Sequence, residues 1–222
     1  MALILHIDTA LQQANVGIAD DGIPLVNIQN EDQYSHAAFV QPAIQEALRQ
    51  SNMSIDSIDA VGVTAGPGSY TGLRVAMASA KGLCYALNKP LLAVNTLEVM
   101  AAAAIEKFPG FDLYCPMIDA RRNEVYTSLY TSSLEVSMPV TALILEKTSF
   151  EKALANVTVL YFGNGSIKFK NTIEPHANAF FEEVAYDGAH LAKCLFKSFK
   201  HNDFQDLAYA EPLYVKDFYL GK

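Results

Sequence analysis

The sequence has no tryptophan, only three cysteines and a low charged fraction, 18% of the chain. Its cysteines are widely spaced, odd in number and absent from any CxxC pair; they are Cys84, Cys115 and Cys194. This usage predicts neither a disulfide framework nor a thiolate metal site, and it fits a reducing cytoplasm.

Basic residues are scarce as well. Lysine and arginine number 16 against 24 acidic residues, which gives a formal net charge of −8. A protein that binds nucleic acid unaided needs Lys and Arg to displace counterions from the phosphates. We therefore expect this chain alone to bind nucleic acid poorly.

Long apolar runs are also missing, since no stretch reaches the ~18 apolar residues that suggest a membrane-spanning helix. The first eight residues are broken by His6 and Asp8 and lack the basic segment and cleavage site of a leader, so we expect a soluble, unprocessed chain without membrane contact. What the sequence does have is a hydrophobic fraction of 51% over 222 residues, enough to bury a substantial core. Disorder as the main state is excluded.

Hydrophobic periodicity predicts alternating strands and helices in the first half of the chain. Short apolar runs bounded by turn residues predict strands, and apolar residues spaced three and four apart predict amphipathic helices. The first of these helices contains Pro42, where a kink is expected. Strands are expected at 3–8, 14–19, 23–29, 60–65 and 90–95, and helices at 35–50, 71–88 and 96–107.

The second half repeats this order more loosely. Ile118-Asp119 echoes Ile7-Asp8, and the stretch 163–166 echoes the glycine-containing stretch 66–69. Further strands are expected at 113–119, 124–130, 136–145 and 157–162, and a helix at 187–201. Together the echoes predict an α/β protein of two related lobes, 1–107 and 108–222, divided at the Pro- and Gly-containing stretch 108–111.

The loop Gly66-Pro67-Gly68-Ser69 lies between a predicted strand and a predicted helix. Free N–H groups at a helix N-terminus attract anions, and glycine lets backbone approach a phosphate closely, so the loop is a candidate phosphate or acyl-phosphate cradle. A tight strand-to-helix turn that needs no ligand explains the same residues. The chain lacks GxxxxGK[ST], GxGxxG, a GxSxG elbow and paired metal-binding histidines, which argues against a P-loop, a dinucleotide fold, a serine hydrolase and a histidine metal site.

The helix expected at 71–88 is rich in small side chains, which let another helix approach closely. It is either a core helix pressed against a sheet or, with the helix at 35–50, an interface with another subunit. The predicted helix at 187–201 carries Lys193, Lys197 and Lys200 on one side, which reads as a solvated face or as a contact for an anionic partner.

Several motifs together resemble the bacterial TsaB (YeaZ) family. The most specific is GPGSYTGLR at 66–74, and the likeness is dense over about residues 3–130. The accompanying motifs are Ile7-Asp8-Thr9, Ala80-Lys81-Gly82-Leu83, Val94-Asn95-Thr96-Leu97 and Glu211-Pro212-Leu213-Tyr214-Val215.

The resemblance implies a two-lobed actin-like ATPase (ASKHA) fold with a duplicated β-β-β-α-β-α core, the last residues packing back on the N-terminal lobe. It also implies a non-catalytic scaffold for the paralogue TsaD in making N(6)-threonylcarbamoyladenosine beside the tRNA anticodon. The ATPase TsaE would join a larger complex, tRNA would be reached only through that complex, and a homodimer of the free chain is left open. The implied interface lies on the two N-lobe helices and includes Phe39, Ala43, Leu73, Arg74, Met77, Ala80, Lys81 and Cys84.

Comparison with the catalytic paralogue implies that the metal chemistry is lost. The two metal-binding histidines of that relative correspond to Thr96 and Met100, and its acidic hairpin pair corresponds to Gln12 and Gln13. Thr and Met are poor ligands for hard or borderline divalent ions. No metal, catalytic residue or required cofactor is expected, and weak nucleotide binding is left open at Asp8, Thr9, Gly66, Gly68 and Ser69.

Two other functions remain as alternatives. The first is an ATP-dependent small-molecule phosphotransferase of the same superfold, for which Asp8 and Asp119 are the candidate metal–nucleotide acids. The second is a peptidase, which ranks last because it needs a metal pair or an activated nucleophile and the sequence shows neither.

Overall fold

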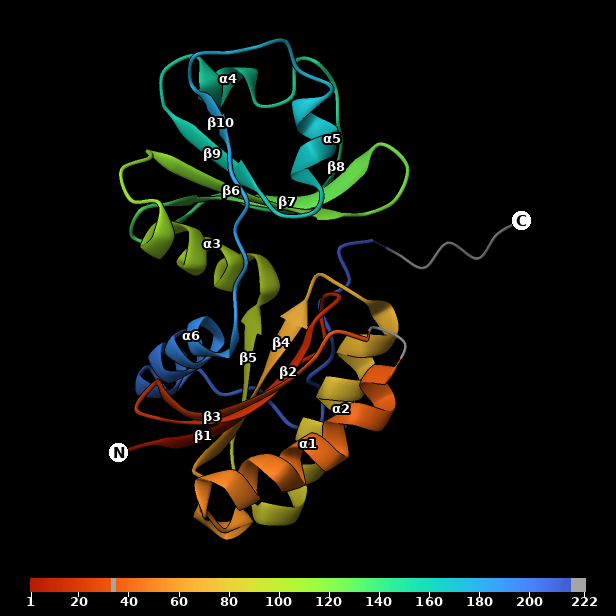
Figure 1. The fold of residues 1–222 in the computed structure, drawn as a ribbon, viewed down its shortest axis with the longest axis vertical. Helices are drawn as coiled ribbons and strands as arrows, with labels where there is room; N and C mark the ends of the chain where they lie inside the picture. The colour runs from red at the N-terminus through yellow and green to blue at the C-terminus, as the bar shows by residue number, and fades with distance from the viewer. Residues whose placement is uncertain (33–34, 217–222) are drawn as a thin grey trace, which may run out of the picture. The chain divides into compact units, whose positions relative to one another are not determined.

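The computed structural model describes residues 1–32 and 35–216 and divides into two compact units (Figure 1). The first unit contains Met1–Thr96 and Tyr186–Leu213, and the second contains Leu97–Ala185 and, of the described C-terminal residues, 214–216. Within the described residues, no helix is both long enough and apolar enough to cross a membrane.

The first unit is built on a five-stranded sheet of order β3-β2-β1-β4-β5. β1 pairs antiparallel with β2 and parallel with β4, so a three-stranded meander is extended by two parallel strands. The strands are β1 (Leu3–Asp8), β2 (Ala14–Asp20), β3 (Ile23–Asn30), β4 (Ala60–Gly66) and β5 (Leu91–Asn95). The helices of this unit are α1 (His36–Ser51), α2 (Tyr70–Leu87) and α6 (Gly188–Lys200), with a short 3₁₀ helix at Ile55–Ser57.

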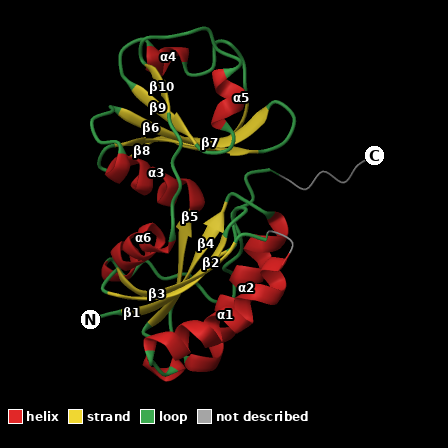
Figure 2. Cartoon of the chain, in the orientation of Figure 1, coloured by secondary structure: helices red, strands yellow, loops and turns green. Residues whose placement is uncertain are grey.

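Helices cover both faces of this sheet because its strands carry apolar side chains on both faces. Leu3, Leu5 and Ile7 of β1 enter the core formed with α1 and α2. α6 packs on the opposite face, where Leu195 lies against Gly62 of β4 (Figures 1 and 2).

Capping residues set the ends of the two helices on the first face. Ser69 begins α2, since its Oγ accepts a hydrogen bond of 3.3 Å from the N–H of Gly72. Asn52 and Asn88, both with positive φ, end α1 and α2. Pro42 lies inside α1 without ending it.

The second unit repeats the first. Its sheet has the order β10-β9-β6-β7-β8, which is the order of the first sheet when β6 is matched to β1. The strands are β6 (Leu113–Asp119), β7 (Glu124–Thr131), β8 (Val136–Ile144), β9 (Val159–Phe162) and β10 (Ala179–Phe181), and the helices are α3 (Thr96–Lys107), α4 (Glu151–Leu154) and α5 (Ser166–Lys170). The expected α/β class and the duplicated core of β-β-β-α-β-α order are therefore confirmed.

The units differ from lobes divided at residue 107, because the last helix of each repeat belongs to the other unit. α3 groups with the second unit, where the side chain of Met100 meets Gly163 and the Nζ of Lys107 donates to the carbonyl of Glu183 at 3.0 Å. α6 groups with the first unit because Leu191, Ala192 and Leu195 are buried there.

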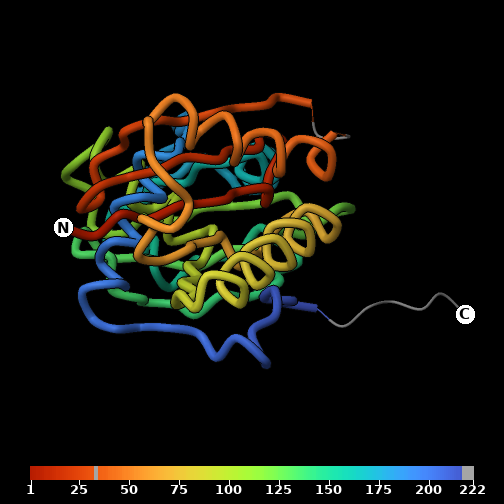
Figure 3. Tube along the Cα trace, turned by 90° about the horizontal axis from the view of Figure 1, so that it is seen from below, coloured from red at the N-terminus to blue at the C-terminus, as the bar shows by residue number. Residues whose placement is uncertain are grey.

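The chain after α6 continues along the first unit as a strap, residues 201–213 (Figure 3). The N–H of Gln205 donates to the carbonyl of Leu91 at 2.9 Å, and the N–H of Leu213 donates to the carbonyl of Ala65 at 2.8 Å. Between these points the Nζ of Lys81 on α2 donates to the carbonyls of Ala208 and Ala210, at 3.3 and 2.9 Å.

Candidate functional site

Asp8 ends β1 and is almost fully buried, with 2% of its surface exposed. Its Oδ1 accepts hydrogen bonds from the hydroxyl of Thr64 at 2.6 Å and from the N–H of Ala10 at 2.9 Å. Burial raises the pKa of Asp8, although these hydrogen bonds act against the shift. The carboxyl that the sequence singled out is thus enclosed and engaged by its own chain.

Two further ionisable groups lie near Asp8. Burial, with the Asp8 charge as a second cause, raises the pKa of the Tyr186 hydroxyl well above its ordinary value. His36, buried on α1, favours the charged form of Asp8, and its Nε2 lies 3.1 Å from the carbonyl oxygen of Gln12. The Asp8 carboxyl therefore joins β1 to β4 by hydrogen bonding and interacts electrostatically with α1 and with the segment before α6.

The predicted glycine loop is occupied by the chain's own β1–β2 hairpin. The N–H of Ser69 donates to the carbonyl of Ala10 at 2.6 Å, and the Oγ1 of Thr9 donates to the carbonyl of Gly72 at 2.6 Å. A Cβ at Gly68 would collide with the Ala10 carbonyl oxygen, and one at Gly72 would collide with that of Thr9. Close backbone contact within the fold thus explains these glycines, so the tight-turn interpretation accounts for them without a ligand.

Gly66 has a different reason to be glycine. Its φ is +122°, a conformation that L side chains rarely adopt, and a Cβ there would lie 2.9 Å from the carbonyl oxygen of Leu213 in the strap. The five predicted site residues Asp8, Thr9, Gly66, Gly68 and Ser69 therefore lie where β1, β4 and α2 meet.

The second unit contains a counterpart of this arrangement at Asp119. Its Oδ1 accepts from the N–H of Arg121 at 2.6 Å, just as Asp8 accepts from the second residue after it. Unlike Asp8, it is paired with a cation, the Nζ of Lys168 at 2.6 Å. Partial burial raises the pKa of Asp119, but the Lys168 hydrogen bond and the Arg121 N–H outweigh burial and leave it lowered.

The positions aligned with metal ligands lie on α3. The side chain of Thr96 is fully buried, and its hydroxyl has no hydrogen-bond partner within the described residues. Met100 is also buried and packs against Gly163. Over residues 1–32 and 35–216, no group of three or more His, Cys, Asp or Glu side chains is placed to hold a metal ion.

Most of the residues expected at a partner interface lie inside the first unit instead. Ala43, Leu73, Met77, Ala80 and Cys84 are buried, with at most 4% of their surface exposed. They face the sheet because the apolar stripe of each helix is the side that the core requires. They therefore cannot contact a partner directly.

The remaining three expected interface residues are accessible. Phe39 is half-buried against the core, Lys81 holds the strap, and Arg74 is exposed, its Nη1 donating to the hydroxyl of Tyr70 at 2.6 Å.

Beside them lies a surface that the sequence did not single out, the α1–α2 face. The side-chain amide of Gln41 donates to the hydroxyl of Ser79 at 3.2 Å and links the two helices, which pack against each other (Figure 1). The α1–α2 face consists of the exposed residues Ala38, Gln41, Pro42 and Gln45 of α1 and Arg74, Ala78, Gly82 and Tyr85 of α2.

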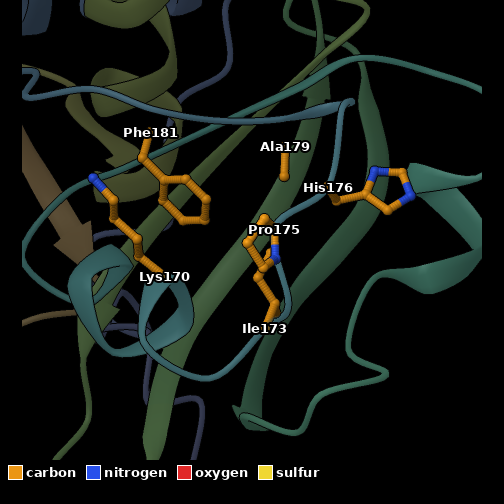
Figure 4. Close-up of a pocket in the computed structure, with 6 residues that line it drawn as sticks. All are labelled: Lys170, Ile173, Pro175, His176, Ala179 and Phe181. Atoms are coloured by element: carbon orange, nitrogen blue, oxygen red, sulfur yellow. The ribbon is translucent and has the colours of Figure 1, made fainter.

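Two other features stand apart from these residues. Lys193, Lys197 and Lys200 are all exposed on α6, as expected for a solvated face. A pocket of about 270 Å³ in the second unit is lined by Lys170, Ile173, Pro175, His176, Ala179 and Phe181 (Figure 4). Its lining is mostly apolar and includes none of the site residues expected from the sequence.

Three residues of the site were missed because the sequence marks them weakly or not at all. Thr64 is one buried residue of an apolar strand, Ala10 contributes only its backbone, and Tyr186 is distant in the sequence from Asp8. Only the polar character of Thr64 within the run 60–65 hints at its role.

Comparison with known proteins identifies the family. The family model described as "TsaD: tRNA N6-adenosine threonylcarbamoyltransferase" matches residues 30–210. The tRNA threonylcarbamoyladenosine biosynthesis protein TsaB of Bacillus subtilis is 30% identical over 174 residues, covering 77% of this chain and 75% of that protein. The Escherichia coli protein of the same name is 37% identical over 128 residues, covering 57% and 54% respectively.

Solved structures agree in fold. A Pseudomonas aeruginosa protein described as similar to peptidase YEAZ superimposes with a TM-score of 0.84 at 23% identity, covering 97% of this chain and 100% of that one. A second structure, YeaZ from Pseudomonas aeruginosa, gives a TM-score of 0.80 at 22% identity, covering 96% and 100%. The chain therefore belongs to the TsaB (YeaZ) family, whose curated members are named for tRNA threonylcarbamoyladenosine biosynthesis.

Proposed function

We propose that this chain is a non-catalytic subunit that binds and positions the transferase TsaD in the synthesis of threonylcarbamoyladenosine in tRNA. The α1–α2 face is its docking surface. The observation that carries this proposal is Gly82, which lies inside α2 and is exposed; apart from its own helix backbone, no atom of residues 1–32 and 35–216 lies within 4 Å of where its Cβ would stand.

No contact in the described part of the chain requires glycine at this position. Glycine in a helix interior costs about 1 kcal/mol relative to alanine, and here neither a positive φ nor a close internal neighbour offsets that cost. Ala78 lies one turn before Gly82 and is also exposed, whereas Tyr85 has 83% of its surface exposed. Small residues beside an accessible aromatic ring suit the close approach of a second helix.

The partner is expected to present a similar pair of helices. The family model that describes the transferase matches most of this chain, including α1 and α2. Two related helix pairs can pack into a four-helix contact in which each small-residue surface admits the ridges of the other. In the absence of the transferase, the same face would mediate a homodimer.

The residues near Asp8 and on α3 favour a non-catalytic role. The Asp8 carboxyl is already satisfied by Thr64 and Ala10, and Thr96 and Met100 are poor metal ligands. No cofactor is required in this proposal, and any nucleotide would bind weakly. The ATPase TsaE and the tRNA would join through the assembled complex in the cytoplasm.

The test is complex formation with the TsaD of the same organism, measured by sizing chromatography. Ala78→Arg and Gly82→Arg place a long charged side chain on the α1–α2 face without entering the core, and each should abolish the complex. Ala155→Arg, at an exposed position after α4, is the matched control and should leave it intact. Failure of the wild-type chain to form a complex would refute the proposal.

Reconstitution of the tRNA modification separates this role from that of an enzyme. Omitting the chain, or supplying Gly82→Arg, should reduce formation of the modified nucleoside, and the wild-type chain should restore it. A phosphotransferase would instead turn over Mg-ATP in isolation. ATP turnover by the isolated chain that Asp8→Asn abolishes would favour that alternative.

A further inference from the structure

We propose that Arg121 and Arg122, at the tip of the β6–β7 hairpin, bind phosphate groups of the RNA backbone. Both residues are exposed, and neither guanidinium group makes a hydrogen bond, an ion pair or a ring contact within residues 1–32 and 35–216. This inference rests on the proposed function, because it assigns part of the RNA contact to a chain that works within a tRNA-modifying complex.

The backbone of the tip is unusual for these residues. Arg121 has φ +68° and Arg122 has φ +48°, the left-handed region that favours glycine, asparagine and aspartate. Most other non-glycine residues with positive φ in the described chain are Asn or Asp. Leu134 and Phe150 are the other two exceptions, and Phe150 is compensated by ring contacts with Tyr161 and Phe169.

No comparable side-chain contact within the described residues compensates the two arginines. Two hydrogen bonds of Asp119 fix the backbone of the tip. Its Oδ1 accepts from the N–H of Arg121 at 2.6 Å, and its own N–H donates to the Oδ1 of Asn164 at 2.8 Å. The hairpin therefore fixes the arginine backbone while leaving both guanidinium groups in solvent.

No ion pair within the described residues involves either arginine. The carboxylates two residues to either side are each paired with a lysine: Asp119 with Lys168 at 2.6 Å and Glu124 with Lys216 at 2.5 Å. Within this group the acidic and lysine charges cancel, and Arg121 and Arg122 remain as a local positive charge on a chain whose net charge is −8.

Adjacent guanidinium groups suit a phosphodiester backbone. Each presents a planar fork of donors that matches two oxygens of one phosphate, and an RNA strand offers such phosphates in succession. An acidic protein segment carries the same sign of charge. We favour RNA because the curated relatives are named for a reaction on tRNA, and the other partner is an outcome of the test below.

The decisive variant is Arg121→Asn/Arg122→Gly, which removes both guanidinium groups and places in the left-handed region two residues that adopt it readily. Its Tm should be equal to or higher than that of the wild type, so that weaker binding cannot be ascribed to unfolding. In complex with the transferase, its affinity for an unmodified tRNA transcript should fall roughly tenfold, and the slope of log K against log salt should flatten by about 1.5.

Two further variants identify the chemistry. Arg121→Lys/Arg122→Lys keeps the charges without the planar forks and should retain the salt slope with reduced affinity. Lys152→Gln/Lys170→Gln removes two exposed charges from α4 and α5 of the same unit and should change neither quantity. Equal tRNA affinity and equal salt slope in wild type and Arg121→Asn/Arg122→Gly would overturn the proposal.

Complex formation, measured on the same samples, separates this inference from the proposed function. If the variant binds the transferase normally but loses tRNA affinity, the result supports both the proposed function and the RNA contact. If it loses the transferase instead, the tip contacts protein and the RNA assignment is wrong. If even the wild type forms no complex, the proposed function fails, and the same tRNA titration on the isolated chain at low salt decides whether the arginines bind RNA.

Discussion

The Thr64 hydroxyl donates a hydrogen bond of 2.6 Å to the buried Asp8 carboxyl and thereby joins the ends of β1 and β4. Thr64→Val keeps the shape of the side chain but removes this donor. The Asp8 Oδ1 then keeps only the N–H of Ala10 as a donor. Because losing a hydrogen bond to a buried acceptor costs about 1–3 kcal/mol, we expect the free energy of unfolding to fall by that amount in urea denaturation. Thr64→Ser retains the hydroxyl and should cost less, and equal losses for both variants would contradict the role of the hydrogen bond.

Two glycines of the α2 region should respond to alanine in opposite directions. In Gly68→Ala the new methyl group meets the Ala10 carbonyl, so the hairpin or the loop must move and stability should drop by roughly 2 kcal/mol or more. In Gly82→Ala the methyl group enters open space, and stability should rise by about 1 kcal/mol. The same denaturation experiment measures both, and a neutral Gly68→Ala would refute the contact between loop and hairpin.

Lys81 holds the strap by its two hydrogen bonds to the carbonyls of Ala208 and Ala210. Lys81→Met retains the length of the side chain without the ammonium group, so the amides of residues 206–213 should exchange hydrogen faster while those of β1 and β4 stay protected. Lys89→Met, just after α2, is the control. Unchanged exchange in the strap would show that the Leu91–Gln205 and Ala65–Leu213 contacts hold it alone.

Because of the buried His6 side chain, we expect the protein to lose stability in mild acid. Burial lowers its pKa to about 4, an effect that the Asp187 charge partly opposes, and its ring nitrogens have no hydrogen-bond partner within the described residues. Between about pH 4 and its ordinary value of 6.5, the unfolded chain therefore binds a proton that the folded chain does not. The free energy of unfolding is therefore highest, as far as His6 decides it, above pH 6.5. It falls as the pH drops from 6.5 to 4, by about 3 kcal/mol in total.

The comparison for this prediction is His6→Leu, measured by urea denaturation from pH 4 to 7. Leucine has no proton to gain, so the difference in unfolding free energy between the two proteins should change with pH over this window. Asp8 acts in the opposite direction, since burial raises its pKa and the folded state keeps its proton longer, but this contribution is common to both proteins. Parallel pH curves would show that His6 titrates normally in the folded chain.

Much of the fold was predictable because it depends on local pattern. The short apolar run of β1 and the three- and four-residue apolar spacing of α1 and α2 are local sequence patterns, and the echo of Asp8 by Asp119 indicated the duplication. The short elements α4, α5 and β10 and the 3₁₀ helix at Ile55–Ser57 were missed, since three to five residues span too little of a period to be distinguished from a loop.

Which partner an element packs against was not predictable, because that is decided by contacts distant in the sequence. The composition of α2 suggested both a core helix and an interface, and only burial assigns Met77 and Ala80 to the core and leaves Ala78 and Gly82 on the surface. Likewise, α3 and α6 follow their own repeats in the chain but pack in the other unit.

By itself, the sequence determined the strands, the long helices, the duplication and the family motifs, because each is encoded in the order of neighbouring residues. The tertiary structure alone decided that Ala10 fills the glycine loop, that lysines neutralise Asp119 and Glu124 but leave Arg121 and Arg122 exposed, and that α2 keeps Gly82 at its surface. These relationships join atoms from separate elements, so they exist only once the sheets and helices have packed.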